Sequence, residues 1–140
     1  MRKGMIRAVR GSAAALAVVL AAGCAAIPGS TPEEVVRSRA NENWKARVAG
    51  DLDRAYTYMP PSYRAVTPLD RYKKSFATAA KLTSAQVTDV KCESADKCVA
   101  TVRIEAQAVM PRIQGALPPL VTHYDETWIR EGGQWWLFEQ

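Results

Sequence analysis

The amino-acid sequence predicts an α+β domain in which N-terminal helices pack on a mainly antiparallel sheet of about four strands. Helix start signals recur between residues 31 and 70, each followed by apolar residues at helical spacing. From Ser84 onward, apolar and polar side chains alternate instead. Gly132-Gly133 separates two strand-like runs, as in a tight hairpin turn. Helices followed by strands, without regular alternation of the two, favour the α+β class.

The N-terminal segment keeps its charged and apolar residues in separate blocks. Residues 1–10 contain four basic residues and no acid, and residues 13–22 are all Ala, Val or Leu. An apolar run of about ten residues is roughly half of what spans a bilayer. Residues 1–23 are therefore expected to be a cleavable export signal.

The apolar run ends at Ala22-Gly23-Cys24, which resembles the lipobox of bacterial lipoproteins, with Ala21 where that motif prefers Leu. The resemblance implies cleavage before Cys24, lipidation of its thiol and a tether over residues 24–30. It places the protein in the bacterial cell envelope, lipid-anchored. Ala25 resembles the sorting pattern for the outer membrane, facing the periplasm. An ordinary secretory signal with an incidental cysteine is the alternative.

Loss of the signal would also remove most of the net charge. The chain has 19 basic and 14 acidic residues, and four of the basic residues lie in the signal. The remainder is nearly neutral, and Lys73-Lys74 is its longest basic run. Nucleic-acid binding therefore has little support. Residues 31–140 have the length of one domain.

Three helices are expected in the first half of this domain. Thr31-Pro32-Glu33-Glu34 predicts a capped start, and Gly50 predicts the end of that helix. Asp51 caps a short second helix that ends at Pro60-Pro61. Thr67-Pro68 begins a third. The first helix carries an apolar stripe, formed by Val36, Ala40, Trp44 and Val48.

Strands are expected from Ser84 to the C-terminus. Every even position from Cys98 to Met110 is apolar, which predicts one buried face. Cys92 and Cys98 flank a polar turn and are expected to form a structural disulfide in an oxidising compartment. Direct opposition of the two cysteines would place position 88 opposite 102 and position 86 opposite 104. A redox or metal pair is the alternative, but the spacing is not Cys-x-x-Cys and no metal site is expected.

The C-terminal hairpin is apolar on both faces if Glu131 lies opposite Gln134. One face can be core, and the other then needs cover from a homodimer or an envelope protein partner. Packing of all these residues into the core is the alternative. The candidate interface residues are Trp128, Trp135 and Leu137.

Several of these features together resemble the nuclear transport factor 2-like (cystatin-like cone) superfamily. They are the helix with a central Trp44, Ala49-Gly50-Asp51, Pro61-Ser62-Tyr63-Arg64, and strands running from Trp128 to Trp136 across a Gly-Gly turn. The resemblance covers residues 31–140 and implies a curved sheet that encloses a cone-shaped cavity. Members include isomerases, dehydratases, ligand-binding modules and envelope lipoproteins.

A pocket of this kind would present a few polar groups on an apolar surface. In the expected register, Gln86 and Thr88 share the inner face with Val102 and Ile104. A solvent-facing strand edge is the alternative for these two positions. The candidate pocket residues are Trp44, Arg64, Gln86, Thr88 and His123.

No catalytic residue is assigned. His123 is the single histidine, and Asp125 lies about 6.5 Å along the same strand face, too far for an ordinary orienting hydrogen bond. We therefore expect a non-catalytic, membrane-anchored module without a cofactor, which binds a protein partner or a small apolar ligand. A cavity enzyme of the isomerase or dehydratase kind is the alternative function.

Overall fold

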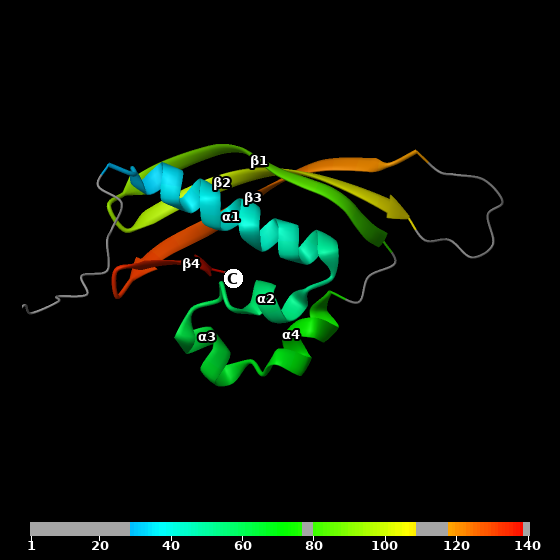
Figure 1. Ribbon diagram of the computed structural model, residues 1–140, viewed down its shortest axis with the longest axis horizontal. Helices are drawn as coiled ribbons and strands as arrows, with labels where there is room; N and C mark the ends of the chain where they lie inside the picture. The colour runs from blue at the N-terminus through cyan, green and yellow to red at the C-terminus, as the bar shows by residue number, and fades with distance from the viewer. Residues whose placement is uncertain (1–28, 77–79, 109–117, 139–140) are drawn as a thin grey trace, which may run out of the picture.

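A computed structural model describes residues 29–76, 80–108 and 118–138, so the expected signal and Cys24 lie outside the described residues. Within these ranges four helices precede four strands, and the α+β class is confirmed (Figure 1). The strands form one antiparallel sheet with the order β1-β2-β3-β4. The elements are α1 (Pro32–Ala49), α2 (Leu52–Tyr56), α3 (Pro61–Val66), α4 (Leu69–Ser75), β1 (Ala80–Ser94), β2 (Lys97–Ala108), β3 (Leu120–Glu131) and β4 (Gln134–Phe138).

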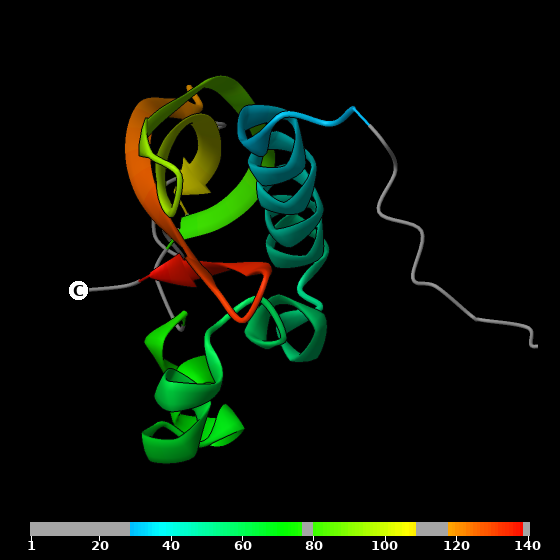
Figure 2. The same cartoon turned by 90° about the vertical axis from the view of Figure 1, so that its left-hand side faces the viewer.

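The sheet is strongly curved, and α1 lies along its concave side (Figure 2). The three short helices gather on the β4 side of the molecule (Figures 1 and 2). One core joins these layers, because buried side chains of α1, α2, α4 and all four strands contact one another. The inner face of β2 supplies its centre, with the predicted even positions Cys98 to Ile104 buried.

Local sequence signals fix both ends of α1. Thr31 and Glu34 form the predicted capping box, in which each side chain accepts a hydrogen bond from the other residue's backbone N–H. Gly50 ends the helix in the left-handed conformation, at φ 75°. Of the predicted stripe, Val36, Ala40 and Trp44 are buried, so the helix packs through that face.

The region between α2 and α4 differs from the prediction. Pro61 starts a helix, α3, because proline lacks an N–H and has a helical φ, which suit the first helical position. The expected third helix exists as α4, but Pro68 occupies its N-cap position and no side chain caps it. Thr67 instead ends α3, and its carbonyl accepts a hydrogen bond of 2.6 Å from the Tyr56 hydroxyl.

The expected pairing of β1 with β2 is right near the cysteines and wrong beyond them. Cys92 lies opposite Cys98 and Val90 opposite Ala100. An irregularity between Val87 and Asp89 then inserts one extra residue, so Val102 lies opposite Val87 and Ile104 opposite Ala85. One inserted residue reverses the facing of every later side chain. Gln86 and Thr88 therefore do not share the inner face.

Side chains of α1 bind the outer edge of β1 at Val87. Asn41 Oδ1 accepts a hydrogen bond of 3.1 Å from the Val87 N–H, and Arg37 Nη1 donates one of 3.3 Å to the Val87 carbonyl. These bonds occupy the groups that a further strand would need. Together with the bulges along β1, they make this edge a poor template for strand addition.

The candidate interface residues Trp128, Trp135 and Leu137 are buried in the core, which corrects their expected exposure. The segment between α2 and α3 covers them. The Tyr58 ring lies edge-on to Trp128 with centroids 6.4 Å apart, and the Tyr58 carbonyl accepts a hydrogen bond of 2.9 Å from the Leu137 N–H. The predicted pairing of Glu131 with Gln134 is confirmed, and Trp136 on the other face is half-buried.

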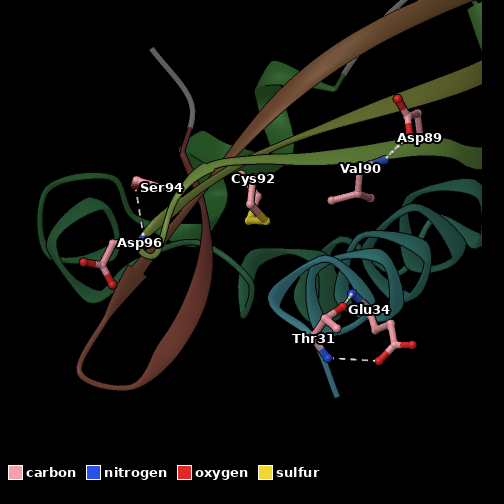
Figure 3. Close-up of a disulfide and its surroundings, with 8 residues drawn as sticks. Thr31, Glu34, Asp89, Val90, Cys92, Ser94 and Asp96 are labelled. Carbon is pink, nitrogen blue, oxygen red and sulfur yellow. Dashed lines mark hydrogen bonds between the residues drawn. A yellow bond between two sulfur atoms is a disulfide. The ribbon is translucent and has the colours of Figure 1, made fainter. Parts of the chain in front are cut away.

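A disulfide joins Cys92 to Cys98 across the β1–β2 turn. Figure 3 shows it on the side of the sheet that faces the first turn of α1, near Thr31 and Glu34. Cys98 is fully buried, so this crosslink closes the core at that end of the sheet.

Replacing both cysteines, as Cys92→Ala with Cys98→Ala, should lower the free energy of unfolding by about 2 kcal/mol, because the unfolded chain loses a constraint on a short loop. Urea unfolding of the two forms without reductant measures this difference. The unfolded, unreduced wild-type domain should show no free thiol at either position. Two reactive thiols there, or equal stability of the two forms, would contradict the assignment.

Candidate functional site

A cleft of about 450 Å³ opens where the C-terminal end of α1 approaches the start of β1. The start of α2 and the residue after α4 complete its walls. The lining residues are Trp44, Arg47, Val48, Ala49, Gly50, Leu52, Phe76, Ala80, Lys81 and Leu82. Its volume is in the range of small-molecule sites.

The cleft is mainly apolar and carries positive charge. The Arg47 guanidinium carbon lies 4.9 Å from the ring centroid of Trp44 and 4.9 Å from that of Phe76, so it contacts both rings. Lys81 is the second cation, and no acidic residue is among the described lining residues. This surface suits a ligand with an apolar body and an acceptor or anionic group.

A buried carboxyl group holds the Trp44 wall of the cleft from behind. Glu126 on β3 is only 2% exposed. Its Oε2 accepts a hydrogen bond of 2.9 Å from Trp44 Nε1, and its Oε1 accepts one of 2.8 Å from Trp128 Nε1. Tyr124 adds an edge-on ring contact to Trp44, with centroids 6.4 Å apart.

The Trp44 indole is therefore held through three contacts of different kinds. Glu126 binds its N–H, Arg47 lies over its ring, and Tyr124 meets it edge-on. An aromatic wall fixed in this way reduces the ordering cost of binding, since the side chain is already in place.

Of the candidate pocket residues, only Trp44 lines this cleft. Arg64 lies on α3, where its guanidinium carbon is 5.8 Å from the centroid of the Trp136 ring. The Thr88 hydroxyl donates a hydrogen bond of 3.1 Å to the Thr101 carbonyl at the sheet surface. Gln86 pairs with Arg103 on the outer face because of the bulge in β1.

His123 is exposed and lies opposite Arg103 in the β2–β3 register, outside the cleft. Asp125, which shares its face of β3, accepts a hydrogen bond of 2.7 Å from the Thr101 hydroxyl. The carboxylate thus has a partner on the neighbouring strand.

Shifted pKa values occur outside the cleft. Burial raises the pKa of the Tyr58 hydroxyl, and its 2.8 Å hydrogen bond to Glu42 adds to the shift. Burial lowers the pKa of Arg39, whose guanidinium carbon lies 5.1 Å from the Tyr58 ring centroid. A hydrogen bond from Lys91 lowers the pKa of Asp89 on the sheet surface. These shifts follow from local packing and pairing, and do not identify an acid–base pair in the cleft.

Within residues 29–76, 80–108 and 118–138, no group of three or more His, Cys, Asp or Glu side chains is arranged to hold a metal ion. No helix in these ranges is long and apolar enough to cross a membrane.

The sequence interpretation missed Arg47, Phe76 and Glu126 as parts of this site. Arg47 lies three residues after Trp44, a spacing that places both on neighbouring parts of one helix surface. Glu126 lies between Tyr124 and Trp128 at even spacing on a strand, an acid on an otherwise aromatic face. An acid at such a position has to find hydrogen-bond donors inside the protein. This pattern could have indicated from the sequence that Glu126 is buried and bound to neighbouring side chains.

Comparisons with known proteins bear on the fold alone. No family model matches the chain, and no curated protein matches it. A solved structure with a similar fold is RPA3114, described as a SEC-C motif containing protein from Rhodopseudomonas palustris. The two chains are 16% identical with a TM-score of 0.54, over 78% of this chain and 76% of the other.

This similarity corrects the family resemblance drawn from the sequence. The structural neighbour belongs to a different family from the nuclear transport factor 2-like lipoproteins, so that family assignment is wrong. The motifs that carried it were a helix with a tryptophan, proline-rich turns and a Gly-Gly hairpin, which unrelated α+β domains can share.

Glu126→Gln should lower the free energy of unfolding by about 1–3 kcal/mol, because the amide offers one acceptor oxygen where two buried indole N–H groups need one each. Glu131→Gln on the same strand is the matched control, since this exposed residue should change stability by less than about 0.5 kcal/mol. Chemical denaturation followed by tryptophan fluorescence measures both variants. If Glu126→Gln were as stable as the Glu131→Gln control, Glu126 would not be the residue that holds the two indoles.

Proposed function

We propose that this protein is a lipid-anchored module of the bacterial cell envelope that binds a small, largely apolar ligand in the cleft beside Trp44. The observation that carries the proposal is the cleft of about 450 Å³, whose lining is mainly apolar and includes two aromatic rings and two cations. A concave apolar surface with few polar groups is the usual form of a small-ligand site.

The charge of the cleft narrows the class of ligand. Arg47 and Lys81 are the titratable groups of the described lining, and both are cationic side chains. They favour a ligand whose apolar part meets Trp44 and Phe76 and whose polar end accepts hydrogen bonds. Proton abstraction needs a positioned base, and a positively charged arginine or lysine side chain cannot accept a proton. Binding without chemistry is therefore the better-supported role.

The membrane anchor in this proposal rests on residues 1–24 and not on any relative. A basic start, a short apolar run and Cys24 after small residues support export and lipidation. The disulfide between Cys92 and Cys98 supports an oxidising compartment, because such bonds persist outside the reducing cytosol.

Ligand binding can be tested with N-phenyl-1-naphthylamine, a neutral apolar fluorophore that brightens on leaving water. Val48→Trp should weaken its binding at least about tenfold, because the larger side chain fills the cleft. Val66→Trp is the matched control, since Val66 is an exposed helical valine on α3 away from the cleft. Titration followed by fluorescence gives the dissociation constants.

Wild type and Val66→Trp should bind the fluorophore with the same affinity and saturate at one site per chain. Absence of saturable binding to the wild type would contradict the cleft as a ligand site. Equal weakening in both variants would assign the loss to a general effect of the added tryptophan.

Anchoring can be tested by expressing the full chain in a bacterium. Cys24→Ser should abolish lipidation of the protein, because the serine hydroxyl does not replace the lipidated thiol. Labelling with an alkyne-bearing palmitate should mark the wild type and not the variant. Ala26→Ser is the control and should remain labelled and membrane-bound. A soluble, unlabelled wild type would contradict the anchor.

A further inference from the structure

The outer edge of β3 is only partly occupied. β4 pairs with Thr127 to Glu131, whereas β2 pairs with β3 along its other edge from Leu120 to Ile129. Residues 120–126 therefore have a strand on one side, and no strand within the described ranges pairs with their other side. Figure 1 shows β3 extending well beyond β4.

This free edge is also the main exposed apolar region of the described chain. Leu120, Val121 and Tyr124 are 65%, 44% and 48% exposed, and they are three of the five large hydrophobic side chains that are exposed there. Phe138, a fourth, pairs with Thr127 where the free edge ends. Apolar side chains stand on both faces of the strand, since Val121 alternates with Leu120 and Tyr124.

The outer edge of β1 and the free edge of β3 differ in how well they are protected against pairing with another strand. At β1, Asn41 and Arg37 occupy the backbone groups of Val87, and bulges distort the strand. The free edge of β3 carries no bulge in its pairing with β2, and its residues from 120 to 125 are all exposed. A regular, exposed and partly apolar edge is the kind that accepts another strand.

We propose that a second copy of this chain pairs antiparallel with residues 120–126, with a two-fold axis at His123. Within the described residues, β4 pairs no further along β3 than Thr127, and seven residues of a second copy match the length of the remaining edge. His123 then faces His123 of the second copy, and Val121 faces Asp125 of the second copy. Such an isologous contact closes on itself, and the two sheets become one.

The side chains at this edge are complementary in that arrangement. His123 of each copy lies diagonal to Asp125 of the other, within reach of a polar contact. Two imidazoles meet at the axis and can share a hydrogen bond, since the ring provides both a donor and an acceptor. No two acids or two basic ammonium groups face each other, and Thr122 lies opposite Tyr124 of the second copy on the inner face.

Cysteine crosslinking tests the register of this pairing. The full chain with Cys24→Ser serves as background, because its remaining cysteines are joined in the Cys92–Cys98 disulfide. His123→Cys in that background should form a reducible covalent dimer under mild oxidation, because directly opposed Cα atoms lie about 4.5–5.5 Å apart. Val66→Cys, an exposed position on α3, is the control and should stay monomeric on non-reducing gels.

Sedimentation of the chain without added cysteines tests the association itself. The Cys24→Ser chain should dimerise reversibly, and His123→Lys should raise the dissociation constant at least about tenfold by placing two ammonium groups at the axis. Val66→Lys adds the same charge elsewhere and should leave the constant unchanged. A monomer at about 100 µM, or equal crosslinking of both cysteine variants, would overturn the proposal. Neither result depends on ligand binding in the cleft.

Discussion

The hydrogen bonds of Glu126 are the interaction on which the arrangement of layers depends. This carboxyl group joins Trp44 on α1 to Trp128 on β3, and both bonds are buried. A buried acid is costly without donors, so any packing of α1 that removes the Trp44 indole N–H leaves one oxygen of Glu126 without this partner. Apolar contacts alone permit a helix to slide or rotate on a sheet. The bond from Trp128 orients the Glu126 carboxyl group within β3, and the directional bond from Trp44 then specifies the position of α1 along the concave face.

The cleft follows from that position. With Trp44 fixed, the last turn of α1 projects past the core toward the start of β1, and Gly50 turns the chain away into α2. Phe76 then approaches from the end of α4, and Arg47 fills the space between its ring and that of Trp44. The walls of the cleft thus come from four separate segments. Trp44 supports the Arg47 and Phe76 part of these walls through its contact with the Arg47 guanidinium.

Local chemistry made part of this structure predictable. Thr31, Glu34 and Gly50 specify the ends of α1 through contacts within a few residues, and Gly132-Gly133 adopts the positive φ values that a tight hairpin needs. The extra residue near Thr88 has no comparable local signal, and it reversed the facing of Gln86. Whether Trp128 was core or interface depended on Tyr58, far away in sequence. The cleft itself depends on such distant contacts, so it could not be predicted from the sequence beyond Trp44.

The cleft and the free edge of β3 share one aromatic contact. Tyr124 belongs to the edge, and its ring meets Trp44, which lines the cleft. A substitution at Trp44 or Glu126 therefore alters the core, the cleft wall and the edge together. Its effect on ligand binding or on self-association cannot be assigned to one of these regions. Val48 and His123 each belong to one of these two regions. Val48 lines the cleft, and His123 is exposed on the outer face of β3. Because distant positions without shared partners act additively, these two residues separate ligand binding from self-association.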